Sequence, residues 1–448
     1  MLKRKIDSYI RNYYATSRNA LLVTGARQTG KTYSIREFGK TFKSFIEINF
    51  VENPDAVGIF KGAKNSTDIL LRLSAMTTNP LIKGETLIFF DEVQECKDIV
   101  TAVKFLVDDG SYRYILSGSL LDVELKDLRS EPVGYMDVKE MHPLDFEEFI
   151  LGIGVNAQVI DALHDAWINH TIVDDLIHSK MLELFRLYLV IGGMPAAVNE
   201  YIESNNLQNV MSVQKGIINM YKRDIAKYDP NNKQYIEDIF NLIPPELNAK
   251  NKRFILKNVR ENAKFERYRN SFLWLANAGV ALPVYNVEEP KVPLLLARSR
   301  NLFKLFQNDV GLLAAQYAGG LQLRVINGDA AINYGAIYEN AVAQELVAHG
   351  FQPYYYNNKK RGELDFVIEY NGNALPIEVK SGKDYELHRA LSNIMECDEY
   401  NIPTAVVLSN SNLRAEGKII YAPVYMVMFL KQDDSAPVYY KVDLTGLL

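Results

Sequence analysis

The chain has 448 residues, of which 48% are hydrophobic and 23% are charged, and its net charge is −5. This length favours about three domains, and the composition excludes a disordered or fibrous protein. The acidic balance excludes a uniformly basic surface, so nucleic-acid binding would need a local basic groove. Two distant cysteines favour a reducing compartment, and no stretch approaches the ~20 apolar residues of a membrane helix. We therefore expect a cytoplasmic protein without a membrane-spanning segment.

Residues 1–18 are predicted to form a basic helix that covers an edge of the first sheet. The apolar residues 21–23 then predict a buried strand. Residues 25–32 read Gly-Ala-Arg-Gln-Thr-Gly-Lys-Thr, which is the spacing of a phosphate-binding loop between a strand and a helix. The two glycines permit backbone angles that turn successive N–H groups inward, and the following helix presents its positive N-terminal end to phosphates.

The side chains of this loop suit a nucleoside triphosphate. Lys31 is expected to place its ammonium group against the terminal phosphates, and the Thr32 hydroxyl is expected to ligate Mg²⁺. The sequence therefore predicts ATP and Mg²⁺ as cofactors. The predicted nucleotide-binding residues are Gly25, Ala26, Arg27, Gln28, Thr29, Gly30, Lys31, Thr32 and Tyr33.

Two later strands are predicted to end near this loop. Residues 87–92 contain four apolar residues followed by Asp91 and Glu92, as in a strand buried on both faces. Asp91 is expected to orient Mg²⁺, and Glu92 to polarise the attacking water. Residues 112–119 predict a further strand, and either Ser117 or Ser119 could lie beside the γ-phosphate. The predicted catalytic residues are Lys31, Glu92 and Ser119.

These motifs and the segment Pro-Leu-Asp-Phe-Glu-Glu-Phe at residues 143–149 resemble those of prokaryotic AAA-type ATPases that carry a C-terminal domain of unknown function. Residues 192–195 resemble the Gly-Gly-x-Pro turn of that family. Residues 221–225 resemble its Arg-Asp-Ile helix, and residues 303–313 its Phe-Lys…Asp-x-Gly-Leu-Leu block. The resemblance spans nearly the whole chain and implies ATP binding and hydrolysis. The chain departs from it at Tyr135, where many members have an arginine.

The middle of the chain is predicted to be mostly helical. Residues 151–235 have a helical pattern that suits a lid or adaptor. Arg223 and Asp224 are expected to form an ion pair there, and the alternative is that they reach the nucleotide from the lid. Residues 264–278 predict a helix followed by a hairpin, as in a winged helix. Arg260, Lys264 and Arg267 recur on one face of a helix there, which could contact DNA phosphates or serve as solvated surface beside a protein partner.

The C-terminal part predicts a small α/β unit with a helix that carries Glu339. Asp365, Glu378 and Lys380 follow in the order of the restriction-endonuclease-like fold, although Leu364 replaces the proline of its motif. Glu378 and Lys380 should emerge on one face of a strand because side chains alternate along it. Asp365 and Glu378 would then hold a metal, Lys380 would support nuclease chemistry, and Glu339 would add a ligand. The alternative is a scaffold that only binds partners.

The predicted fold class is α/β, with a P-loop AAA-type ATPase core, a helical and winged-helix-like middle and a restriction-endonuclease-like C-terminal domain. The expected domains are residues 1–150, 151–235, 236–330 and 331–448. We expect Mg²⁺-dependent ATP hydrolysis by a nucleotide switch that acts on or near DNA, with a possible nuclease activity. The alternative is a regulatory ATPase whose C-terminal domains dock protein partners or associate with another copy of the chain.

Overall fold

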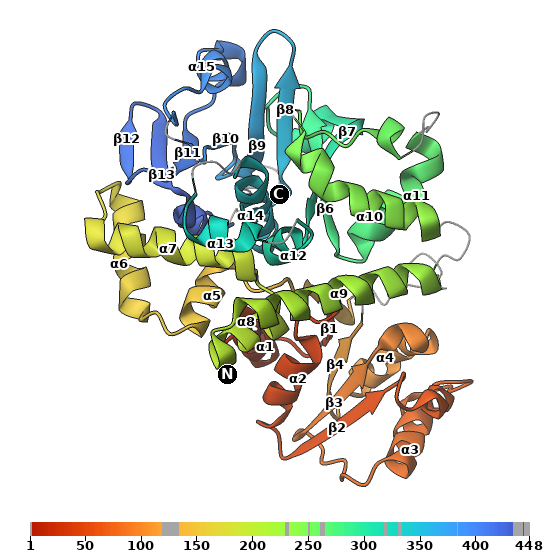
Figure 1. Ribbon diagram of the computed structural model, residues 1–448. Coiled ribbons are helices and arrows are strands. Elements are labelled where there is room, and N and C mark those ends of the chain that lie inside the picture. The colour runs from red at the N-terminus through yellow and green to blue at the C-terminus, as the bar shows by residue number, and fades with distance from the viewer. Residues whose placement is uncertain are drawn as a thin grey trace.

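The computed structural model describes residues 2–118, 134–228, 233–249, 251–259, 265–317, 320–329, 334–382, 384–432 and 442. Two sheets organise the chain, a five-stranded sheet near the N-terminus and an eight-stranded sheet formed by later segments. Figure 1 shows the five-stranded sheet at the bottom, the eight-stranded sheet at the top and helices between them.

The five-stranded sheet has the order β2-β3-β4-β1-β5, and every neighbouring pair is parallel. The carboxyl ends of all its strands therefore lie along one edge. The strands predicted at residues 21–23, 87–92 and 112–119 are present, whereas the exposed outer strand β5 was not predicted from the sequence. The strands are β1 (Ala20–Thr24), β2 (Ser44–Asn49), β3 (Thr86–Asp91), β4 (Arg113–Ser117) and β5 (Met136–Glu140).

Helices cover both faces of this sheet. One face packs against α1 (Lys5–Thr16) and α2 (Lys31–Gly39) through side chains such as Ile10 and Ile35. The other face packs against α3 (Ser66–Met76) and α4 (Asp98–Asp109). The predicted N-terminal helix therefore exists but covers a face of the sheet rather than an edge. Short 3-10 helices, η1 (Pro54–Ile59) and η2 (Val93–Glu95), follow β2 and β3.

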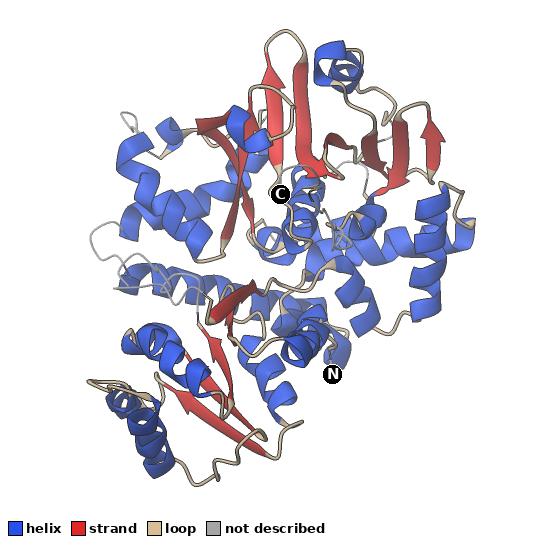
Figure 2. Cartoon of the chain, turned by 180° about the vertical axis from the view of Figure 1, so that it is seen from behind, coloured by secondary structure: helices blue, strands red, loops and turns tan. Residues whose placement is uncertain are grey.

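A helical region follows β5, as the sequence predicted for residues 151–235. In both Figures 1 and 2, α9 runs between the five-stranded sheet and the remainder of the molecule. No single helix in the described ranges is long and apolar enough to cross a membrane, and α7 with α8 passes that test only as a pair bent by 119°. The helices are α5 (Phe146–Gly152), α6 (Ala157–Asn169), α7 (Asp175–Ile191), α8 (Pro195–Ser204), α9 (Leu207–Tyr228) and α10 (Lys233–Asn248).

The eight-stranded sheet is mixed and has the order β12-β13-β11-β10-β9-β8-β6-β7. Its middle pairs, β10 with β9 and β9 with β8, are antiparallel, whereas β10 pairs with β11 and β6 pairs with β8 in parallel. Its strands are β6 (Ala281–Val287), β7 (Arg298–Gln307), β8 (Tyr354–Asn358), β9 (Gly362–Tyr370), β10 (Asn373–Val379), β11 (Ala405–Ser409), β12 (Arg414–Glu416) and β13 (Ile419–Pro423).

The remaining helices pack around this sheet. Among them, α14 is buried over most of its length and lies near the centre of the molecule in Figure 1. These helices are α11 (Phe265–Asn277), α12 (Val310–Ala315), α13 (Leu321–Ile326), α14 (Gly335–Ala348) and α15 (Arg389–Met395), with η4 (Leu256–Asn258), η5 (Leu294–Ala297), η6 (Asp398–Tyr400) and η7 (Val424–Phe429).

The helix and hairpin predicted as a winged helix are present as α11, β6 and β7. The hairpin does not end in a separate small sheet, because β6 pairs with β8 and extends the C-terminal sheet. A single hydrophobic cluster also runs from Leu144 to Leu430. The expected boundary at residue 330 therefore does not divide two sheets or two cores. The winged-helix and endonuclease-like assignments stay predictions.

Two of the sequence blocks that resemble the ATPase family meet in this core. The buried carboxylate of Asp309 accepts hydrogen bonds from the N–H of Gly193, at 2.5 Å, and from the N–H of Leu312, at 2.9 Å. A Cβ at Gly192 would lie 2.2 Å from Asp309 Oδ1, so this turn requires glycine where its φ is 73°. The Gly-Gly turn therefore fixes the end of α7 to the start of α12.

Candidate nucleotide-binding site and C-terminal ionic cluster

The segment predicted to bind phosphates forms a tight loop between β1 and α2. Gly25, Gln28 and Gly30 have φ angles of 140°, 64° and 98°. A Cβ at Gly25 would lie 2.2 Å from the carbonyl oxygen of Met141, so no other residue fits there. Because α2 begins at Lys31, its unpaired N-terminal N–H groups lie at this loop.

The Lys31 ammonium group lies inside the loop. Its Nζ donates to the carbonyl oxygens of Gly25, at 3.0 Å, and Ala26, at 2.8 Å. Burial lowers the pKa of Lys31 to about 8, although the nearby carboxylates of Glu92 and Asp91 raise it. Burial disfavours the charged form of this ammonium group, so negatively charged phosphate oxygens that approach it would stabilise that form.

Asp91, at the end of β3, joins this loop to two neighbouring strands. Its Oδ2 accepts from Thr32 Oγ1 and from Asn49 Nδ2, each at 3.1 Å, and its Oδ1 accepts from Ser117 Oγ. Burial raises the pKa of Asp91 above its ordinary value. The structure thus brings Thr32 and Asp91 together as predicted. It adds Asn49, which lies at the carboxyl end of β2.

Glu92 follows Asp91 in a left-handed conformation with φ of 56°, and its carboxylate accepts a hydrogen bond from the side chain of Gln94. Because β3 ends at Asp91, this turn places Glu92 outside the strand. Ser119, the third predicted catalytic residue, lies outside the described residues.

The middle of the loop contacts α9. Arg27 Nη1 lies 2.7 Å from Asp224 Oδ1, and the Tyr221 hydroxyl donates to the Arg27 carbonyl oxygen at 3.3 Å. The side chain of Gln28 approaches Met220 Sδ at 3.4 Å. Sequence reasoning assigned Asp224 to a pair with Arg223, whereas the structure places it on Arg27. Tyr33, predicted to bind nucleotide, is 48% exposed on α2.

The donor set fits a magnesium-bound triphosphate. The loop offers N–H groups at a helix N-terminus and a cation, and the strand ends offer a hydroxyl and a carboxylate, the oxygen ligands that Mg²⁺ prefers. The buried Asp91 carboxylate, with its raised pKa, is a group that a divalent cation would stabilise.

A second cluster of charges gathers the residues predicted as a nuclease site. Asp365 on β9 and Glu378 on β10 lie together, where Asp365 Oδ2 accepts from the N–H of Val379 at 2.9 Å. Lys380 Nζ lies 3.4 Å from Glu378 Oε2. Glu339 is buried in α14 beside them. The structure therefore brings together all four predicted residues.

Two further lysines, which the sequence analysis did not assign to this site, enter the same cluster. Lys304 on β7 is fully buried, and its Nζ lies 2.9 Å from Glu363 Oε1, 3.6 Å from Glu339 Oε2 and 4.0 Å from Asp365 Oδ1. Lys252 pairs with Glu339. Among the described residues, no three His, Cys, Asp or Glu side chains are arranged to hold a metal.

The charges of the cluster are nearly balanced. Four carboxylates, those of Glu339, Glu363, Asp365 and Glu378, face the ammonium groups of Lys252, Lys304 and Lys380. Burial, reinforced by Asp365, raises the pKa of Glu378 well above its usual range. Attraction to Lys304 and Lys252 outweighs burial and lowers the pKa of Asp365. A protonated Glu378 would leave equal numbers of each charge.

The predicted basic face of the middle region cannot be placed. Arg260 and Lys264 lie outside the described residues, and so does the side chain of Arg267. Contact of this face with DNA stays a prediction.

Three family models match separate parts of the chain. Residues 17–150 match the family model described as an AAA domain. Residues 182–323 match a domain of unknown function (DUF8612), and residues 334–426 match another (DUF4143). No curated protein sequence matches the chain.

Solved structures give more distant likenesses. A Walker-type ATPase of Pyrococcus abyssi is 15% identical with a TM-score of 0.44, and the match covers 70% of this chain and 96% of that chain. Cdc6p of Pyrobaculum aerophilum is 13% identical with a TM-score of 0.23, covering 72% and 92%. The Aeropyrum pernix Orc1 protein, solved in complex with DNA, is 12% identical with a TM-score of 0.28, covering 73% and 91%.

The family match falls on the segment that holds the parallel sheet, the phosphate-binding loop and the Asp91 cluster. Residues 17–150, which match the AAA-domain model, are therefore the part of this chain that forms the candidate nucleotide-binding site.

Proposed function

We propose that the chain binds ATP with Mg²⁺ at the loop between β1 and α2 and hydrolyses it. The observation that carries this proposal is the 3.1 Å hydrogen bond between Thr32 and Asp91, which joins the loop to the end of β3. It brings a hydroxyl and a carboxylate to one point, beside the cation of Lys31. Such a group of ligands serves magnesium-bound phosphates.

Each residue has a distinct part in this proposal. Lys31 and the loop N–H groups neutralise and orient the phosphates, and Thr32 and Asp91 would hold the metal. A bound Mg²⁺ would neutralise charge that develops on the transferred phosphoryl group. Glu92 orients the attacking water and accepts its proton, and Ser119 is assigned to the γ-phosphate.

Substitution of Lys31 tests the binding step. Lys31→Ala should abolish tight ATP binding in a calorimetric titration, because Lys31 holds its ammonium group inside the loop whereas the cation of Arg27 is paired with Asp224. Lys40→Ala is the matched control, since it removes the same charge from an exposed position just after α2. Unchanged ATP affinity in Lys31→Ala, with a folded protein, would contradict the proposal.

We further propose that ATP acts as a conformational switch, whose effect extends from the phosphate-binding loop to the rest of the chain. The contacts of Arg27 with Asp224 and Tyr221 support this, because they tie the nucleotide loop to α9. A loop that closes on phosphates would alter the position of these groups. The change would then reach the helices and the eight-stranded sheet.

The partner that responds to the switch is either DNA or a protein. The ATPase rate should be measured with and without double-stranded and single-stranded DNA, together with a gel shift over a salt series. A salt-dependent shift that is lost on charge reversal at Lys264 and Arg267 would favour DNA. No shift and no stimulation would favour protein docking.

The ionic cluster favours a binding scaffold over a nuclease in the C-terminal unit. Convergence of Asp365, Glu378 and Lys380 supports a metal-dependent nuclease. Lys304 and Lys252 nevertheless already supply the charge that a metal would supply, which supports a structural role. We therefore assign this unit to docking, with plasmid cleavage in Mg²⁺ and Mn²⁺ as the test of the nuclease alternative.

A further inference from the structure

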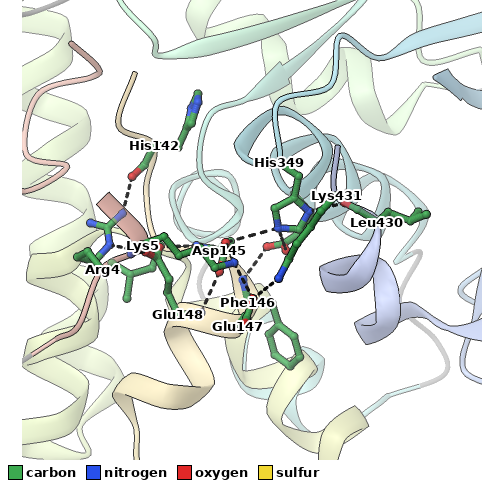
Figure 3. A network of polar contacts seen from close by, with 12 residues as sticks. Arg4, Lys5, His142, Asp145, Phe146, Glu147, Glu148, His349, Leu430 and Lys431 are labelled. Atoms are coloured by element: carbon green, nitrogen blue, oxygen red, sulfur yellow. Dashed lines mark hydrogen bonds and ion pairs between the residues drawn. The ribbon is translucent and has the colours of Figure 1, made fainter. Parts of the chain in front are cut away.

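Arg4 lies buried behind the phosphate-binding loop. Its Nη1 donates to the carbonyl oxygen of Thr29 at 2.8 Å, and its Nη2 donates to the carbonyl oxygen of His142 at 2.7 Å. Its Nε lies 3.1 Å from Glu148 Oε1. Only 8% of the Arg4 surface is exposed. One guanidinium group thus binds the back of the loop, the segment after β5 and an acid of α5, as Figure 3 partly shows.

The contact with Thr29 decides which way a loop N–H points. In a trans peptide the carbonyl of one residue and the N–H of the next point in opposite directions, and the bond between Thr29 and Gly30 is trans. Because Arg4 holds the Thr29 carbonyl on the back of the loop, the Gly30 N–H faces the other side. That N–H is one of the inward-facing donors on which phosphate binding depends.

Other groups close the back of the loop beside Arg4. A Cβ built on Gly30 would lie 3.6 Å from Met141 Cε, 3.7 Å from Pro195 Cγ and 3.8 Å from Arg4 Nη1. The two nonpolar neighbours pack there but cannot hydrogen-bond the Thr29 carbonyl. Arg4 therefore supplies a hydrogen bond that a buried carbonyl requires.

A network outside the loop holds Arg4 in place. Glu148 and Asp145 form the capping box at the start of α5. Asp145 pairs with Lys5 and lies 3.4 Å from Nε2 of His349, the residue that follows α14. Lys431 lies 2.6 Å from Glu147. Figure 3 shows these side chains converging from the N-terminal segment, the start of α5, the end of α14 and the segment that contains Lys431.

We propose that Arg4 is a positioning residue for nucleotide binding, which presets the Thr29–Gly30 peptide so that the loop N–H faces the phosphates. This inference rests on the proposed ATP site and extends it beyond the residues of the loop. Arg4 does not contact the nucleotide. It lowers the cost of ordering the loop before ATP binds.

The test compares two substitutions of Arg4 with a control in the same network. Arg4→Met removes both hydrogen bonds to carbonyl oxygens, and Arg4→Lys keeps the charge opposite Glu148 but loses the planar fork. Lys5→Met removes the pairs with Asp145 and Glu147, and Lys5 makes no described contact with the loop. Lys31→Ala is measured in parallel, with ATP affinity by calorimetry and kcat and KM by phosphate release.

Arg4→Met should raise the Kd and the KM for ATP about tenfold, with kcat at saturating ATP within about twofold of wild type. Arg4→Lys should shift KM in the same direction, and it provides the result if Arg4→Met does not fold. Lys5→Met should lower the melting temperature without changing KM. Wild-type KM in either folded Arg4 variant, or an equal rise in KM in Lys5→Met, would overturn the inference. Wild-type affinity in Lys31→Ala would instead overturn the proposed ATP site.

Discussion

Arg27 of the phosphate-binding loop and Asp224 of α9 form an ion pair in which Nη1 lies 2.7 Å from Oδ1. The Asp224 side chain is 13% exposed and the Arg27 side chain 40% exposed, so water screens the pair only in part. The Tyr221 hydroxyl reinforces it through the Arg27 carbonyl. If the loop changes shape, α9 must therefore move with it or these contacts must break.

The strength of this pair can be measured with a double-mutant cycle of Arg27→Ala and Asp224→Ala. We expect a coupling free energy of about 1 kcal/mol in denaturant unfolding without nucleotide, because water screens this partly buried pair only in part. The matched control is the pair Arg36–Glu47, in which the arginine side chain is 50% exposed and which lies within the P-loop domain. We expect about 0.5 kcal/mol or less there. A coupling of zero for Arg27 and Asp224 would remove the proposed link between the loop and α9.

Glu92→Gln should separate binding from turnover. The substitution keeps Lys31, Thr32 and Asp91 but removes the group that accepts a proton from water, so kcat should fall by about 100-fold or more. ATP affinity measured by calorimetry should stay within about threefold of wild type. Glu95→Gln, at an exposed acid in η2, is the control and should hydrolyse ATP normally. Normal turnover in Glu92→Gln would move the catalytic role to another residue.

The sequence predicted those parts of the site whose residues are close together in the chain. The loop, the helix after it and the Asp91–Glu92 strand end each depend on a few adjacent residues. The outer strand β5 was missed because Met136–Glu140 carries charges and lies largely exposed, so it lacks an apolar run. Arg4 and Lys304 were missed for another reason. Their partners lie far away in the sequence, Thr29 and His142 for Arg4 and Glu339 and Glu363 for Lys304.

The burial of the Asp309 carboxyl group predicts how stability depends on pH. Burial raises the pKa of Asp309 to about 6, whereas an unfolded aspartate titrates near 3.9. Between these values the folded state holds a proton that the unfolded state has lost, so the contribution of Asp309 to stability falls as pH rises. A shift of about two units corresponds to roughly 3 kcal/mol.

Asp309→Asn should remove this contribution. The unfolding free energy of the variant relative to wild type should therefore rise by roughly 2 kcal/mol between pH 4 and pH 7, measured by denaturant titration. Asp55→Asn, at an exposed position in η1, is the control and should show a constant difference. A constant difference for Asp309→Asn as well would show that this carboxyl titrates normally in the folded protein.

The last prediction concerns Lys304, whose buried ammonium group lies among Glu339, Glu363 and Asp365. If lysines balance these acids, any shift of the melting temperature that Mg²⁺ or Mn²⁺ causes without nucleotide should arise at Asp91 and should be unchanged by Asp365→Asn or Glu378→Gln. Lys304→Met should be destabilised by about 3–5 kcal/mol because it leaves buried carboxylates uncompensated. Divalent metal should then restore part of the stability of that variant by binding the folded state.

The nuclease alternative predicts the opposite pattern for the same cluster. Divalent metal would stabilise the wild-type chain, and Asp365→Asn and Glu378→Gln would each remove that stabilisation. Lys380→Met would keep metal binding but lose nicking of supercoiled plasmid. Lys43→Met, which breaks an exposed pair with Glu85 in the P-loop domain, controls for nonspecific effects of losing a lysine. Because removal of Lys304 leaves four carboxylates facing only two ammonium groups, we expect that variant, and not the wild-type chain, to bind metal at this cluster.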